Sequence, residues 1–289
     1  VPVSIIVGFT NGIAVVIALQ QVRDFMGLAI DRMPANSLSQ IHALATHLHT
    51  FNPSAIAIGL ATVAIIIVWP KSYLNVPPGW RRWLARAPGT IAALVLSVLA
   101  VKLLGLQVET IGSRFGGIPN TLPAPALPPI SLAKIEAVLP DAIAFTLLGA
   151  IESLLSAVVA DSMTGRRHRS NCELVAQGAA NIASSVFGGI CVTGTIARTA
   201  TNVRAGARGP ISGMLHAVFL ALFMLVAAPV ASYIPLAALA GVLAVVAWNM
   251  AEKHEFATLM RASLGDAGVL LATFLLVVFR DLTQGILRS

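Results

Sequence analysis

The chain has 289 residues, of which 57% are hydrophobic and only 11% are charged, and its mean hydropathy is +0.85. Because a soluble domain carries roughly 25% charged residues, this composition excludes a water-soluble enzyme and predicts an all-α integral membrane protein that crosses the bilayer several times. The net charge of +7 does not indicate nucleic-acid binding, since the basic residues stand in short clusters between apolar runs.

Eight apolar stretches, taken in chain order, each predict a membrane helix: 3–19, 55–69, 90–104, 137–160, 174–187, 211–228, 236–248 and 267–279. The first stretch has no basic segment before it and no small-residue cleavage site after it, and Val1 is not a start methionine. We therefore expect the chain to be a fragment of a longer membrane protein.

The lysines and arginines between these stretches predict the orientation of the helices. If successive stretches cross the membrane in alternate directions, eleven of these residues lie at helix ends on the same side. That side is predicted to be cytoplasmic, because cytoplasmic loops are rich in lysine and arginine. The eleven are Lys71, Arg81, Arg82, Arg86, Arg166, Arg167, Arg169, Arg204, Arg208, Lys253 and Arg261. The two long loops on the other side, 21–52 and 107–136, hold only four: Arg23, Arg32, Arg114 and Lys134.

The alternation requires residues 188–205 to cross the membrane as well, although this segment is too polar and glycine-rich for an ordinary span. Gly188 and Gly189 break the preceding helix, and Thr193 and Thr195 offer capping hydroxyls for a new one. A half-helix over 195–205 would be about 16 Å long, roughly half of the hydrocarbon thickness. Irregular backbone at that depth is tolerated only where it is buried in protein or lines a cavity.

A half-helix that begins near the membrane centre predicts an anion site. The free N–H groups of its first turn and the positive end of its dipole attract anions, and Arg198 lies in the same turn. The alternative is that Arg198 snorkels or pairs within the bundle. The predicted substrate-binding residues are Thr193, Gly194, Thr195, Ile196, Ala197, Arg198 and Ser153.

The stretch 137–160 presents one face of small and polar residues: Thr146, Gly149, Glu152, Ser153, Ser156 and Ala160. A carboxylate in mid-span is either neutralised by a proton or held by a cation. Glu152, with Ser156 one turn later, is therefore predicted to couple transport to protons. The alternative is a structural ion pair between Glu152 and Arg198.

The common enzyme motifs are absent: neither phosphate-binding glycine loop occurs, and H-E-x-x-H and G-x-S-x-G are missing. No Cys/His spacing resembles a metal site. We expect no enzymatic activity and no cofactor.

Several separated motifs resemble the SulP sulfate permease family. They are Gly8–Ala14 with Gln20, Asp24 and Gly27; Ile151–Ala157, Ala160-Asp161, Thr164-Gly165, His168, Asn171, Glu173-Leu174, Gln177-Gly178 and Asn181; and Phe187–Gly189, Thr193-Gly194, Ala197–Ala200, Asn202, Ala205–Ala207 and Pro210–Ser212. The motifs cover nearly the whole chain.

The resemblance implies a fold of fourteen segments in two inverted repeats of seven, divided into a core and a gate and followed by a STAS domain. On this chain, residues 1–105 correspond to gate spans five to seven and 106–137 to an extracellular linker. Residues 138–228 correspond to core spans eight to eleven with the substrate site, and 229–289 to gate spans twelve and thirteen. This chain would then lack the first four spans, which include the half-helix that faces Thr195. It would also lack the last span and the STAS domain.

The resemblance also implies secondary transport of sulfate, bicarbonate or a C4-dicarboxylate by an elevator mechanism, in a bacterial inner membrane and as a homodimer among membrane lipids. Glu152 stands where sodium-coupled members carry Asp, and Gly149–Leu155 with Val245–Met250 are most similar to bacterial proton-coupled dicarboxylate transporters. We therefore expect symport of an anion with a proton. The alternatives are an electroneutral exchanger, an uncoupled channel, a non-transporting motor element and, with no catalytic set to support it, a membrane-embedded enzyme.

Overall fold

The computed structural model describes residues 3–34, 36–69, 88–119 and 121–279. Every regular element within these residues is helical, and an isolated bridge between Thr110 and Pro235 is the only strand-like pairing there. The predicted all-α class is confirmed. The basic loop from Lys71 to Arg86, which contributed to the predicted orientation, lies outside the described residues.

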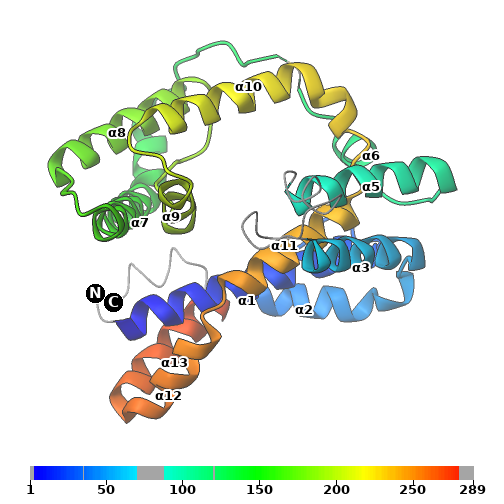
Figure 1. Ribbon diagram of the computed structural model, residues 1–289, viewed down its shortest axis with the longest axis horizontal. Helices are drawn as coiled ribbons and strands as arrows, with labels where there is room; N and C mark the ends of the chain where they lie inside the picture. Colours follow the sequence, from blue (N-terminus) through cyan, green and yellow to red (C-terminus); the bar gives the residue numbers. More distant parts are fainter. Residues whose placement is uncertain (1–2, 35, 70–87, 120, 280–289) are drawn as a thin grey trace, which may run out of the picture. The chain divides into compact units, whose positions relative to one another are not determined.

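The described residues form two compact units, one drawn from Val1–Ile118 with Ala228–Gly285 and the other from Pro119–Ala227. The first unit contains α1 (Val3–Met26), α2 (Ser37–Thr46), the short 3-10 helix η1 (Leu48–Thr50), α3 (Pro53–Val68), α5 (Gly89–Leu104), α6 (Ile111–Phe115), α11 (Leu236–Met250), α12 (Lys253–Ala262) and α13 (Leu264–Phe279) (Figure 1). The second contains α7 (Leu132–Thr164), α8 (Ser170–Val186), α9 (Ile196–Arg204) and nearly all of α10 (Ile211–Ala231).

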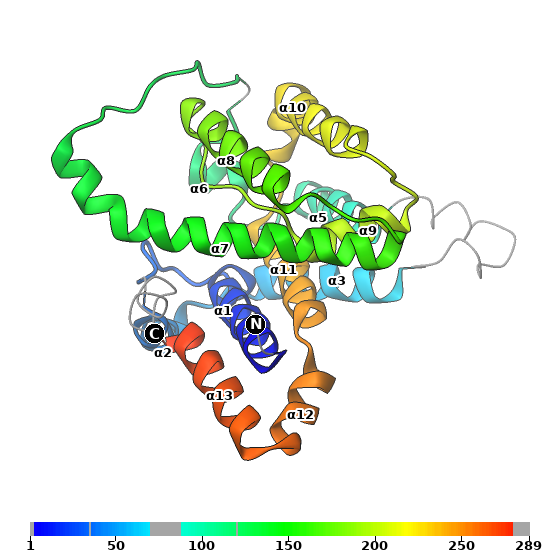
Figure 2. The ribbon, with the colours of Figure 1, turned by 90° about the vertical axis from the view of Figure 1, so that its left-hand side faces the viewer.

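In the first unit, glycines let the helices approach one another closely. Helix α1 packs on α11 and α13, and α11 packs on α3 (Figure 2). A Cβ atom at Gly8 would lie 2.7 Å from the carbonyl oxygen of Leu270, and one at Gly241 would lie 2.9 Å from that of Gly59. Small residues at helix crossings are how membrane helices gain close packing, because lipid tails provide no hydrophobic force between them.

The predicted loop 21–52 contains more structure than expected. Helix α1 continues to Met26, and α2 begins where the side chain of Asn36 accepts a hydrogen bond from the Leu38 amide at 2.9 Å. Leu28, Ile30 and Leu44 form a small buried cluster that holds α2 in place. The apolar-run criterion missed α2 because its ten residues mix apolar and polar side chains.

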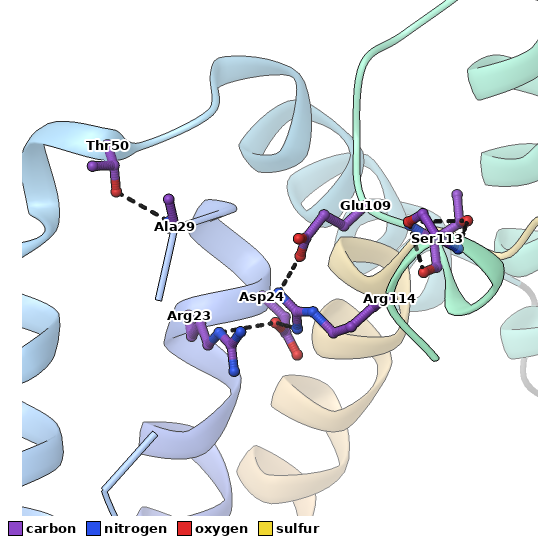
Figure 3. A network of polar contacts seen from close by, with 8 residues as sticks. Arg23, Asp24, Ala29, Thr50, Glu109, Ser113 and Arg114 are labelled. Atoms are coloured by element: carbon purple, nitrogen blue, oxygen red, sulfur yellow. Dashed lines mark hydrogen bonds and ion pairs between the residues drawn. The ribbon is translucent and has the colours of Figure 1, made fainter. Parts of the chain in front are cut away.

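The second long loop, 107–136, is also partly helical. Thr110 and Ser113 form a capping box for α6, and the backbone of this segment bonds to the turn before α11 through Ile111 and Leu236. Arg114, in the last turn of α6, forms ion pairs with both Asp24 and Glu109 (Figure 3). These contacts fasten α6 to the end of α1 within the first unit.

Helix α7 begins at Leu132, five residues earlier than predicted, where the Ser131 hydroxyl caps it, and it runs for 33 residues to Thr164. Its length of about 50 Å exceeds the 30 Å hydrocarbon core. By length and composition α7 can cross a membrane, as can Val3–Met26, Ile211–Ala231 and Leu236–Ala262, while Pro53–Val68, Gly89–Leu104 and Leu264–Phe279 are apolar but shorter.

All eight predicted stretches are helical, which confirms their secondary structure. Helix α8 differs from the others because it carries the polar residues Glu173, Gln177, Asn181 and Ser184, and it is not among the apolar helices of the described chain. The side of the membrane on which each end lies stays a prediction.

Candidate functional site

The candidate site is built around the broken segment between α8 and α9. Helix α8 ends at Val186, and Gly188 then adopts a left-handed conformation with φ of 68°, which a residue with a side chain rarely adopts. The chain runs without regular structure to Thr195, and α9 follows over Ile196–Arg204 with Thr195 and Ala205 as its flanking residues. The predicted helix break and half-helix are both confirmed.

Side chains of α8 satisfy the backbone of this irregular segment. The carboxamide of Asn181 donates to the carbonyl of Val192 and accepts from the N–H of the same residue, both at 2.9 Å. Gln177 donates to that carbonyl as well, and the Ser184 hydroxyl donates to the carbonyl of Ile190 at 2.7 Å. Because backbone groups without partners are costly inside a membrane, these bonds explain how a non-helical segment persists here.

The small face of α7 receives the end of the same segment. The hydroxyl of Thr193 donates to the carbonyl of Gly149 at 2.9 Å. A Cβ atom at Gly194 would lie 3.3 Å from the Cα of Ser153 and 3.5 Å from the Cβ of Ser156, so Gly194 sits directly on these serines. Both serines are buried, with 1% and 4% of their surface exposed. The structure therefore brings together four of the predicted residues: Thr193, Gly194, Ser153 and Ser156.

The expected capping of α9 is wrong in its detail. Thr195 occupies the N-cap position, but its side chain makes no capping hydrogen bond, and the hydroxyl of Thr193 is used on α7 instead. The helical ladder starts with the bond from the Thr199 amide to the Thr195 carbonyl at 3.0 Å. The N–H groups of Ile196, Ala197 and Arg198 precede it, as expected for a helix start that can receive an anion.

The structure does not join the two charged residues of the predicted site. Glu152 is half-buried on α7, and Arg198 is exposed in the first turn of α9. The ion pairs of the described residues involve Arg23, Asp24, Glu109, Arg114, Asp161 and His168, and none links Glu152 to Arg198. The alternative of a structural Glu152–Arg198 pair is thus not what the structure contains.

A second carboxylate, which the sequence analysis did not place in the site, contacts its serines. Glu173 accepts a hydrogen bond from the buried Ser153 hydroxyl at 2.6 Å. The hydroxyl of Ser156 is buried and has no partner among the described residues. The sequence pattern that could have assigned Glu173 to the site is its spacing from Gln177 and Asn181, because residues four apart lie on one face of a helix.

The described residues contain no group of three or more His, Cys, Asp or Glu side chains that could hold a metal ion. The chemistry of the site rests on hydroxyls, backbone N–H groups, one guanidinium and two carboxylates. Such a set can bind an anion and can exchange protons at its carboxylates.

Comparison with known proteins identifies relatives over nearly the whole chain. The sequence model of the sulfate permease family matches residues 1–273. The Bacillus subtilis protein named "Putative sulfate transporter YvdB" is 43% identical over 99% of this chain and 52% of its own length. The bicarbonate transporter BicA of Synechocystis is 32% identical over 99% of this chain and 48% of its own length.

Solved structures agree with these relatives. The transmembrane domain of a cyanobacterial BicA matches with a TM-score of 0.80 and 33% identity, covering 98% of this chain and 68% of that domain. The structure of SLC26A9 matches with a TM-score of 0.84 at 18% identity, over 99% of this chain and 44% of its own, and this shows the shared fold. The chain spans about half the length of the curated relatives it matches.

Proposed function

Because this chain belongs to the sulfate permease family, we propose that it forms part of the membrane domain of a secondary transporter for small anions. Family membership and the apolar helices make it a multi-pass membrane protein. The sulfate and bicarbonate transporters among its relatives support an anionic substrate. A C4-dicarboxylate is also an anion whose oxygens accept hydrogen bonds from N–H groups, so it stays among the proposed substrates.

The start of α9 is the observation that carries this proposal. Its first N–H groups and Arg198 lie in one turn, and Gly194 holds that turn against the buried serines of α7. A helix N-terminus beside a guanidinium is suited to a sulfate, a bicarbonate or a carboxylate, because both attract and hydrogen-bond an anion. The substrate-binding residues are Thr193 to Arg198, with Ser153 supporting them from α7.

We further propose that Glu152 couples transport to protons, with Ser156 one turn away on the same face. The carboxyl group of Glu152 is half-buried and forms no ion pair with Arg198 in the described chain. A carboxyl without a paired cation gains a proton at small cost, so Glu152 can carry one with the anion. An exchanger in which Glu152 only balances the charge of Arg198 would need an ion pair between the two side chains, and the described chain contains no such pair.

The division into two compact units supports an elevator-type mechanism. We propose that the unit containing α7 to α9 belongs to the moving core, within residues 138–228, and that the other unit belongs to the gate, within 1–105 and 229–289. The full-length protein then provides the remaining spans, and we place it as a homodimer in a bacterial inner membrane. Transport is expected of the full-length protein and not of this chain alone.

Proton coupling is tested with the full-length protein in two sets of proteoliposomes. Accumulation is measured in vesicles that have an acidic outside and contain no substrate, and exchange is measured in vesicles preloaded with substrate at equal pH on both sides. Glu152→Gln mimics the protonated carboxyl, so it should retain anion exchange while losing accumulation driven by the pH gradient. Asp141→Asn, on the exposed side of the same helix, is the matched control and should accumulate substrate as the wild type does.

Accumulation against a gradient by Glu152→Gln would show that Glu152 is not the coupling residue. Failure of the wild type to accumulate substrate would leave an exchanger or an uncoupled channel. Loss of both exchange and accumulation, with the protein still folded, would place Glu152 in anion binding instead. The proposal that the family fold carries anions is independent of this result.

A further inference from the structure

Five exposed arginines lie on two neighbouring segments of the second unit. Three lie between α7 and α8, and two lie at the end of α9 and in the loop before α10. The guanidinium of Arg166 donates a hydrogen bond to the backbone carbonyl of Arg208 at 3.2 Å, which places the two loops side by side. We name this group the arginine patch; it comprises Arg166, Arg167, Arg169, Arg204 and Arg208.

The arginines of the patch form no ion pair with the nearby carboxylates of Asp161 and Glu173, which hydrogen-bond elsewhere. Asp161 accepts from the backbone N–H of His168 at 3.0 Å and pairs with its imidazole at 2.7 Å. Glu173 accepts from Ser153 on α7. No arginine of the patch forms an ion pair within the described residues.

An apolar stripe begins directly beside the patch. Only Gly209 and Pro210 separate Arg208 from α10, and the hydroxyl of Ser212 donates to Asn202 on α9 at 2.6 Å, which fixes the start of α10 near the end of α9. Spacing of three and four residues puts Ile211, Met214, Leu215 and Val218 on one face of α10, and Ile211 and Met214 are 69% and 65% exposed.

We propose that the arginine patch and the first two turns of α10 bind an anionic phospholipid, with its phosphate on the arginines and an acyl chain along the stripe. Clustered arginines at the end of a membrane helix attract anionic headgroups, and an adjacent apolar helix face suits the chain of the same molecule. A soluble anion would use the arginines but not the stripe. This inference rests on membrane residence and not on the proposed transport activity.

The test measures lipid retention by native mass spectrometry of the full-length protein, with phosphatidylglycerol and phosphatidylcholine of identical chains as probes. Arg208→Gln removes a charge but leaves the carbonyl that Arg166 uses, so the loop contact is kept. We expect it to reduce the preference for phosphatidylglycerol about fivefold, which corresponds to about 1 kcal/mol per basic residue. Arg166→Gln combined with Arg208→Gln should reduce it further.

Arg32→Gln is the matched control, because Arg32 is exposed and lies in the other unit. It should keep the preference of the wild type, and thermal unfolding in detergent should show that all variants are folded. The proposal is supported if millimolar inorganic phosphate leaves phosphatidylglycerol bound.

Three results would overturn the proposal. Equal retention of the two lipids by the wild type would show that the patch does not select a headgroup. Displacement by inorganic phosphate would make it a site for soluble anions. Unchanged lipid retention in the arginine variants would show that the arginines do not hold the lipid.

Discussion

At the scale of single residues, the carboxamide of Asn181 is the main support of the broken segment, since it both donates to and accepts from Val192. Asn181→Ala removes both bonds and leaves the Val192 N–H without a protein partner, at a cost of about 0.5–1.5 kcal/mol per hydrogen bond. We expect a lower melting temperature of the full-length protein in detergent and weaker substrate binding. Asn171→Ala, an exposed position on the same helix, should change neither. Equal melting temperatures for the two variants would show that Asn181 does not support the segment.

Much of the site follows from the sequence, because its signals are local. Paired glycines end α8, a nine-residue polar helix follows, and small residues recur along one face of α7, so Gly194, Ser153 and Ser156 could be assigned to one place. The contact between Glu173 and Ser153 joins two helices at positions 20 residues apart in sequence. Periodicity within one helix predicts which residues share a face, but not which other helix packs against that face. The contact between Glu173 and Ser153 could therefore not be predicted.

The start of α9 also shows that sequence alone does not predict which acceptor a threonine hydroxyl binds. Threonines on both sides of Gly194 suggested capping groups, yet Thr193 is bonded to Gly149 and Thr195 does not cap. A hydroxyl bonds to whichever acceptor the tertiary structure brings close, and here the α7 carbonyl competes with the helix start.

At the scale of helices, the crossing of α3 and α11 depends on Gly241, whose Cβ position lies 2.9 Å from the Gly59 carbonyl oxygen and 3.2 Å from the Thr62 side chain. We expect Gly241→Leu to force the helices apart and to destabilise the protein by about 1–3 kcal/mol. The measurement is the melting temperature of the full-length protein in detergent. Gly268→Leu is the control, because no atom lies within 4 Å of its Cβ position on α13.

A melting temperature for Gly241→Leu that equals that of the wild type would show that the close approach of α3 and α11 is not required. Equal losses in both variants would attribute the effect to leucine in a glycine position rather than to this crossing. Transport need not be measured for either conclusion.

Apolar runs predicted the longer helices of the described chain and missed the shorter ones of mixed composition. Helices α2 and α12 mix polar and apolar residues over ten positions each, and the extra turns of α1 and α7 lie beyond the apolar runs that predicted them. A hydropathy criterion detects the apolar part of a helix, whereas α7 and α2 begin where the capping side chains of Ser131 and Asn36 occur.

At the scale of the whole molecule, the orientation in the membrane rests on the distribution of basic residues, and cysteine labelling tests it. Cys172 and Cys191 are both free and exposed, so they are first replaced by serine. A cysteine at Thr164 should then react with an impermeant maleimide only from the cytoplasmic side, and one at Ser39 only from outside, since both positions are exposed. Reaction of the Thr164 variant from outside would invert the topology.

The chain covers about half the length of its curated relatives, and its described residues divide into two units, of which the first draws on two distant parts of the sequence and the second is one continuous stretch. A proline-rich segment from Pro119 to Pro129 follows the first boundary, but no composition change marks residue 228, so the sequence alone could indicate the whole division only through resemblance to a family. Packing of α1 against α11 and α13 joins segments more than 200 residues apart, which local patterns do not encode.

The central claim is that the start of α9 binds the anion, and substrate affinity of the full-length protein tests it most directly. Arg198 and Arg204 are both exposed arginines on α9, at its first and last turns, so each serves as the control for the other. Binding is measured for sulfate, bicarbonate and a C4-dicarboxylate, and the tightest of them is used for the comparison. Loss of a charge-assisted contact should make Arg198→Ala bind it more than tenfold more weakly, a change of about 1.4 kcal/mol or more, while Arg204→Ala binds as the wild type does. Unchanged affinity in Arg198→Ala, or the same loss in both variants, would contradict the assignment of the anion site.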